Sequence, residues 1–170
     1  MTTIETPKLE SMEVAVPAVV VAQCRASCSA ETSAIGTAVG GAFEKIDAFV
    51  KANGIATCGA PRVVYTEWGP TGVQFTAAVP VRDIPRGVVD TADVSIASIP
   101  ECSALRFVHR GPYRDIRHTY DQIEAWLRAR GGIRTAADWA RYSPMWEEYL
   151  NDPATTPESE LVTRIYLTLR

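Results

Sequence analysis

The 170-residue sequence has little of the positive charge that nucleic-acid-binding proteins carry. Its 17 lysines and arginines are outnumbered by 20 aspartates and glutamates, which gives a net charge of −3. Binding to nucleic-acid phosphates needs clustered positive charge, and here the basic residues are spread along the chain. The sequence therefore predicts no direct binding of nucleic acid.

Cysteine and histidine are scarce too. The four cysteines form no C-x-x-C pair, and neither histidine stands near a cysteine at metal-ligand spacing. A glycine-rich phosphate loop and a G-x-S-x-G motif are also missing. We therefore expect no metal and no other cofactor, and we interpret Cys24, Cys58 and Cys102 as reduced packing residues.

Long apolar runs are absent. The longest, residues 14–22, is far shorter than the roughly 20 residues that a membrane helix needs. Residues 1–13 are polar and acidic and lack the apolar core of a signal peptide. These features predict a cytoplasmic protein that does not enter a membrane.

What the sequence does contain is an internal repeat. Residues 41–50 and 118–127 align without a gap, and in both segments apolar side chains recur at spacings of three and four, as on one face of a helix. Gly54 and Gly131 follow the last apolar residue of each pattern and are expected to end the helices in a left-handed conformation. An X-Pro pair and an apolar strand precede each helix.

Two strand-like segments follow each helix, at residues 63–68 and 73–81 and again at 145–150 and 161–169. The sequence thus predicts an α+β fold of duplicated β-α-β-β units that form a continuous antiparallel sheet with two helices and a central cleft. Pseudo-repeat 1 spans about 12–82, a linker about 83–93, and pseudo-repeat 2 about 94–170.

The strand at 145–150 carries the clearest chemistry. Alternation places two sets of side chains on opposite faces: Met145, Glu147 and Tyr149, and Trp146, Glu148 and Leu150. On either face a glutamate lies beside an aromatic ring. Such a carboxylate can pair with a cationic ligand, or its pKa can rise until it acts as a general acid or base. The alternative is that both glutamates face water on an edge strand.

Four further residues are candidates with two interpretations each. Tyr113 follows a Gly-Pro turn, which aims it at the cleft or places it in packing at the start of the second helix. His109 is either a catalytic base or a structural hydrogen-bonding residue. Tyr65 and Trp68, in the equivalent hairpin of the first half, line the opposite wall of the cleft or simply pack.

Three segments resemble GyrI-like small-molecule-binding domains: residues 109–113 (His-Arg-Gly-Pro-Tyr), 146–153 (Trp-Glu-Glu-Tyr-Leu-Asn-Asp-Pro) and 160–166 (Glu-Leu-Val-Thr-Arg-Ile-Tyr). Such domains also form the effector-binding part of some AraC-type and MerR-type multidrug-responsive regulators. The resemblance covers about 12–170. It implies two SHS2-like halves around an aromatic cleft that binds bulky lipophilic or cationic compounds.

The resemblance also implies roles for particular residues. Some stand-alone members hydrolyse cyclopropane rings of alkylating natural products with the cleft glutamate and nearby aromatic residues. The corresponding catalytic set is Glu147, Tyr149 and Tyr113. From their positions in the chain we also predict a ligand-binding set of Trp146, Tyr65, Trp68, His109 and Trp139. Trp139 belongs to residues 132–143, a segment longer than its counterpart in the first half and expected to form a lid or extra wall.

Residues 1–11 are too short for a helix-turn-helix, so we expect no transcription factor in this chain alone. The leading hypothesis is a stand-alone protein that binds lipophilic or cationic small molecules for drug or toxin resistance. One alternative is a cyclopropane hydrolase, and another is a protein-interaction module such as an inhibitor that protects DNA gyrase. Edge strands could also pair two copies into a homodimer.

Overall fold

The computed structural model describes residues 8–170. Most of the segment 1–11, for which we expected no helix-turn-helix, lies outside this range. The first half contains β1 (Glu10–Val16), β2 (Val19–Cys28), α1 (Thr32–Ala52), β3 (Ala56–Thr57), β4 (Arg62–Gly69) and β5 (Gly72–Arg82). The second half contains β6 (Val94–Ile99), β7 (Cys102–Arg110), η1 (Tyr113–Asp115), α2 (Ile116–Ala129), η2 (Ala136–Tyr142), β8 (Met145–Tyr149), η3 (Glu158–Glu160) and β9 (Val162–Leu169).

Both predicted helices form where the repeat placed them. Gly54 and Gly131 follow their last turns with φ angles of 63° and 71°, so the left-handed ends are confirmed. Each half, however, begins with one more strand than the predicted β-α-β-β unit. These are β1 and β6, and each pairs with a strand of the other half. Local patterning missed them because that long-range pairing defines them.

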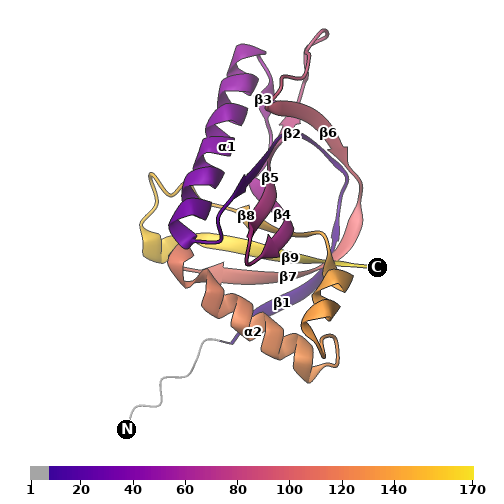
Figure 1. Cartoon of the computed structure of the whole chain (residues 1–170). Coiled ribbons are helices and arrows are strands. Elements are labelled where there is room, and N and C mark those ends of the chain that lie inside the picture. Colours follow the sequence, from indigo (N-terminus) through magenta and orange to yellow (C-terminus); the bar gives the residue numbers. More distant parts are fainter. Residues whose placement is uncertain (1–7) are drawn as a thin grey trace.

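The sheet is antiparallel, in the order β1-β7-β9-β8-β4-β5-β2-β6, with β3 paired to β5 (Figure 1). Exchanging each strand with its counterpart in the other half reverses this order and leaves it otherwise unchanged. The two halves are therefore related by a pseudo-two-fold axis at the β4–β8 join, which confirms the α+β fold built from two similar halves.

The first two strands of each half behave as one long, bent strand. Val16 pairs with Cys102 before the bend and Val19 pairs with Ile99 after it, so the two bent strands pair in the same register on both sides of the bend. Pro17 lies at one bend, and it has no backbone N–H for the ladder. The bent pair links both ends of the sheet, which curves around the face that carries no helix (Figure 1).

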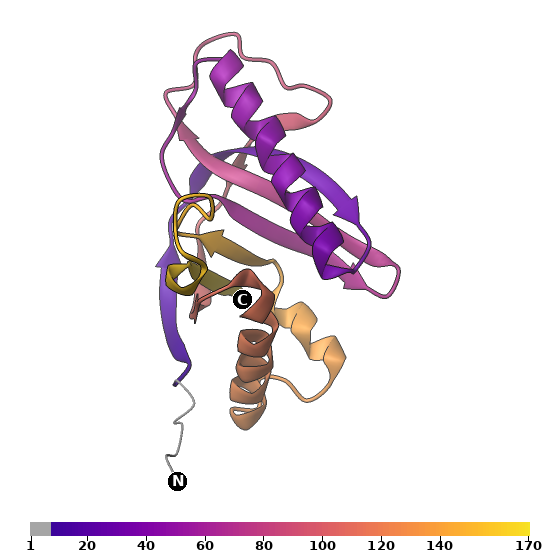
Figure 2. The same cartoon turned by 90° about the vertical axis from the view of Figure 1, so that its left-hand side faces the viewer.

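Both helices cover the other face, here called the helical face (Figures 1 and 2). Under α1 the core includes Ile46, Val63 and Phe75, and under α2 it includes Phe107, Ile123, Ile165 and Leu167. Within residues 8–170 neither helix has the length and apolar character needed to cross a membrane. Cys24 is buried as predicted, whereas Cys58 is exposed, so the packing prediction was wrong for Cys58.

Gly72 in the β4–β5 hairpin provides a test of this topology. Its φ is 146°, and an added Cβ would lie 2.7 Å from the backbone oxygen of Cys28 on β2. We predict that Gly72→Ala lowers the free energy of unfolding by about 1–3 kcal/mol, measured by urea denaturation. The matched control is Gly69→Ala in the same hairpin, where an added Cβ meets nothing within 4 Å. Equal effects of both substitutions would contradict the described β2–hairpin contact.

Candidate functional site

Glu147 lies on β8 at the join between the two halves. It pairs with Val63 of β4 on one side and Ile165 of β9 on the other, and both neighbours are fully buried core residues. Glu147 itself is 5% exposed, so an ionisable carboxyl group is set into an apolar surface beneath the helices. The predicted alternation along the strand is confirmed, while the alternative of a water-facing Glu147 is wrong.

Three tyrosine hydroxyls surround this carboxyl group. Tyr120 on α2 donates to Oε1 at 2.8 Å, and Tyr149 on β8 donates to Oε2 at 2.7 Å. Tyr65 on β4 donates to Oε2 at the longer distance of 3.5 Å. We call Tyr65, Tyr120 and Tyr149 the tyrosine cage. Its members come from both halves, because strand alternation and the apolar stripe of α2 turn all three toward the helical face.

The electrostatics of the cage favour a protonated carboxyl group more than water does. Burial raises the pKa of Glu147, and the hydrogen bonds from Tyr149, Tyr120 and Tyr65 oppose this rise only in part. Burial and the negative charge of Glu147 raise the pKa values of the three tyrosines. The hydroxyls therefore remain protonated at neutral pH and act as hydrogen-bond donors.

Aromatic rings form a second layer around the cage. The ring of Tyr113 packs edge-on against Tyr149 at a centroid distance of 5.5 Å, and Phe43 packs against Tyr149 at 6.5 Å. Trp68 packs against Tyr65 at 5.3 Å and is 63% exposed. Tyr113, Tyr65 and Trp68 thus lie around Glu147, with Trp68 on the outer side.

His109 is buried on the helical face, and both of its ring nitrogens have partners. Nε2 lies 3.0 Å from the carbonyl oxygen of Pro112, and Nδ1 lies 2.7 Å from the hydroxyl of Thr119. Because a carbonyl only accepts, Nε2–H donates to Pro112, and the Thr119 hydroxyl, which can donate or accept, is the partner of Nδ1. The arrangement favours the structural interpretation of His109, which fixes the turn before Tyr113.

Two other predicted ligand-binding residues lie away from the cage. Trp146 faces the helix-free side of the sheet, where its ring stacks on Tyr166 at 4.7 Å. Trp139 lies in η2 and packs against the core cluster under α2. Neither residue is brought onto Glu147.

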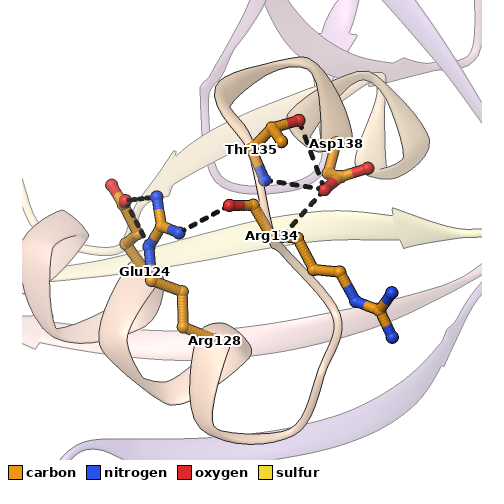
Figure 3. A network of polar contacts seen from close by, with 5 residues as sticks. All are labelled: Glu124, Arg128, Arg134, Thr135 and Asp138. Carbon is orange, nitrogen blue, oxygen red and sulfur yellow. Dashed lines mark hydrogen bonds and ion pairs between the residues drawn. The ribbon is translucent and has the colours of Figure 1, made fainter.

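A polar network fixes the segment that contains Trp139 (Figure 3). Arg128 on α2 binds Glu124 and also donates to the backbone oxygen of Arg134 at 3.0 Å. Asp138 accepts from the backbone N–H groups of Arg134 and Thr135 at 2.8 and 2.9 Å. These bonds hold residues 134–138 against the end of α2, so the segment forms a wall of the second half's core.

Tyr120 is the site residue that sequence reasoning missed, since it counted only as part of the apolar helix stripe. The internal alignment contained a usable signal, because Tyr120 aligns with Phe43. A hydroxyl at a position where the other half has a plain ring indicates a buried polar partner. Among residues 8–170 no group of three or more His, Cys, Asp and Glu side chains is placed to hold a metal ion.

Residues 9–170 match the family model of the GyrI-like small molecule binding domain. The C-terminal domain of EcmrR has a similar structure, with a TM-score of 0.73 at 17% identity over 96% of this chain and 98% of that one. Against EcmrR in its DNA complex, the chain spans 56% of the protein's length. No curated protein sequence matches the chain.

Two further solved structures share the fold. A hydrolase from Listeria innocua has a TM-score of 0.60 at 15% identity, over 96% of this chain and 93% of that one. SAV2435 bound to tetraphenylphosphonium has a TM-score of 0.57 at 8% identity, over 95% and 94%. At these identities the likeness is one of fold.

The raised pKa of Glu147 predicts a specific pH dependence of stability. A carboxyl group whose pKa is higher in the fold stabilises it below the ordinary pKa of 4.5, and this contribution is lost as the pH rises through the folded-state pKa. We compare the free energy of unfolding of Glu147→Gln with that of the parent protein at pH 4.5 and at pH 8. We predict that this difference shifts in favour of Glu147→Gln at pH 8, by about 1.4 kcal/mol per unit of pKa shift.

Urea denaturation at both pH values measures this difference. The control is Glu44→Gln, which replaces an exposed glutamate on α1. Its difference in free energy of unfolding from the parent protein should be the same at both pH values. A Glu147→Gln difference that is constant or shrinks with rising pH would contradict the assignment.

Proposed function

This chain belongs to the GyrI-like small molecule binding domain family, and on that premise we propose that it binds bulky lipophilic cations at Glu147 and the tyrosine cage. The observation that carries the proposal is a buried carboxyl group whose first neighbours are aromatic hydroxyls and rings. A bound cation supplies the positive partner that a buried, negatively charged carboxylate lacks, and the faces of the tyrosine rings add cation–π attraction. SAV2435, which shares the fold, was solved bound to such a cation, tetraphenylphosphonium.

The weakest contact in the cage indicates where a ligand enters. Glu147 is 5% exposed, so a ligand must displace at least one hydroxyl to reach its oxygens. Tyr65 makes the longest of the three hydrogen bonds, at 3.5 Å, and its ring packs on the exposed Trp68. Displacing Tyr65 loses the least hydrogen-bond energy. We infer that a ligand passes between the β4–β5 hairpin and α2 and keeps Tyr120 and Tyr149 as partners of the carboxylate.

A binding protein of this kind would act in drug or toxin resistance by sequestering its ligand unchanged. The same carboxyl group also supports a second candidate, hydrolysis of a cyclopropane. In that reaction ionised Glu147 takes a proton from water, whose oxygen bonds to a ring carbon while a ring C–C bond breaks. Tyr149 or Tyr113 protonates the released carbon and recovers a proton from Glu147, for a net addition of one water.

We predict that purified protein binds tetraphenylphosphonium, and that Glu147→Gln weakens this binding ten- to a hundredfold, the loss of about 1.5–3 kcal/mol typical of a buried charged contact. Triphenylphosphine oxide, a neutral compound of similar shape, should bind the parent protein and Glu147→Gln with affinities that agree within about threefold. Its binding rests on apolar contacts and not on the charge of Glu147. Tryptophan fluorescence measures both affinities.

The control variant is again Glu44→Gln, which should bind both compounds as the parent protein does. Equal losses for the cation and the neutral compound, or none for either, would contradict charge recognition by Glu147. Mass spectrometry of a cyclopropane-bearing alkylator separates the two candidates. Turnover with a gain of one water supports hydrolysis, and an unchanged ligand mass supports sequestration.

A further inference from the structure

The helix-free face of the sheet carries a second charged cluster that the Glu147 site does not use. The neighbour of Glu147 on β8, Glu148, points to this face together with Trp146. Three arginines from three other strands lie on the same face: Arg62 on β4, Arg106 on β7 and Arg164 on β9. We call Arg62, Arg106, Arg164, Trp146, Glu148 and Tyr166 the arginine cluster.

Positive charge exceeds negative charge in the arginine cluster. Glu148 is the one carboxylate of the set, and it lies 3.5 Å from Arg164 and 3.8 Å from Arg62. The Tyr166 hydroxyl also donates to Glu148, at 3.4 Å. Within residues 8–170 Arg106 has no carboxylate within 4 Å, and its Nη2 reaches only the sulfur of Met12 at 3.6 Å.

Several hydrogen-bond donors of the cluster are buried without an acceptor in the described part of the chain. They are Nε of Arg62, Nε of Arg106 and Nε1 of Trp146. Arg62 is 8% exposed, so bulk water does not solvate its guanidinium group freely. A buried donor left unsatisfied is costly, and three gathered on one face indicate a place for an acceptor that the protein does not supply.

A cavity of about 320 Å³ lies beside the two arginines of this set, Arg62 and Arg106. Arg62, Arg106, Glu148 and Tyr166 line it, and residues 14–19, where β1 bends into β2, form its outer wall. Val14, Val16 and Pro80 give the cavity an apolar side as well. Its volume suits a small organic molecule that has one charged end.

We propose that this cavity binds a small molecule through an oxyanion, a carboxylate or a phosphate, held by the guanidinium groups of Arg106 and Arg62. Planar guanidinium groups pair with two oxygens of such an anion at once. Glu148 contacts Arg164 and Tyr166 through Oε1 and Arg62 through Oε2, so it orients the cluster while leaving Arg106 without a carboxylate partner. The proposal is independent of the function at Glu147, which faces the other side of the sheet.

The test is a titration of the full chain with two probes, inorganic phosphate and benzoate. Side-chain N–H signals of arginine and the indole N–H of Trp146 are followed by NMR. We expect saturable shifts with at least one probe, and Arg106→Gln should weaken its binding at least tenfold. Tighter binding of phosphate assigns a phosphate-bearing ligand, and tighter binding of benzoate assigns a carboxylate with an apolar group.

Three variants separate a specific site from a general charge effect. Arg117→Gln removes the same charge from an exposed position on α2 and should leave the affinity unchanged. Glu148→Gln removes the carboxylate that repels an anion and should tighten binding several-fold, while Glu147→Gln should have no effect. Absence of saturable shifts, or equal losses for Arg106→Gln and Arg117→Gln, would overturn the proposal.

Discussion

Burial of the Glu147 carboxyl group at the join between the halves determines what the surrounding residues must supply. A carboxyl group at this depth needs hydrogen-bond donors, and the apolar neighbours on β4 and β9 provide none. Tyr65, Tyr120 and Tyr149 supply them from β4, α2 and β8. The cage thus exists only when both halves are folded and joined, which ties the integrity of the site to that of the sheet.

The backbone of the two halves is related by pseudo-two-fold symmetry, but the side chains that they contribute to this site differ in chemistry. The strand partner of Glu147 across the join is Val63, and the counterpart of Tyr120 in the internal alignment is Phe43. The first half therefore contributes mainly apolar contacts, together with the Tyr65 hydroxyl, and the second half holds the ionisable group. Placing one carboxyl group on the axis gives the site a single charge to offer a ligand.

Local patterns were enough to predict both helices, their glycine ends and the alternation that turns Glu147 and Tyr149 the same way. The same patterns could not reveal β1 and β6, because these strands depend on pairing with residues about 70 to 100 positions away in sequence. The same alternation already turned Trp146 away from Glu147, so its predicted ligand-binding role does not belong to the Glu147 site. Tyr120 was missed because the apolar pattern of α2 counts it as one more packing ring and does not indicate that its hydroxyl has a buried partner.

The two faces of β8 now have separate chemistry: a caged carboxyl group under the helices and an arginine cluster on the other side. The central claim is that burial raises the pKa of Glu147 and that a bound cation favours its ionised form. The most direct test is NMR titration of the Glu147 side-chain carboxyl carbon, with and without tetraphenylphosphonium. A pKa above 4.5 that falls when the cation binds is the predicted result. A pKa at or below 4.5 in the free protein, or one that the bound cation leaves unchanged, would contradict the claim.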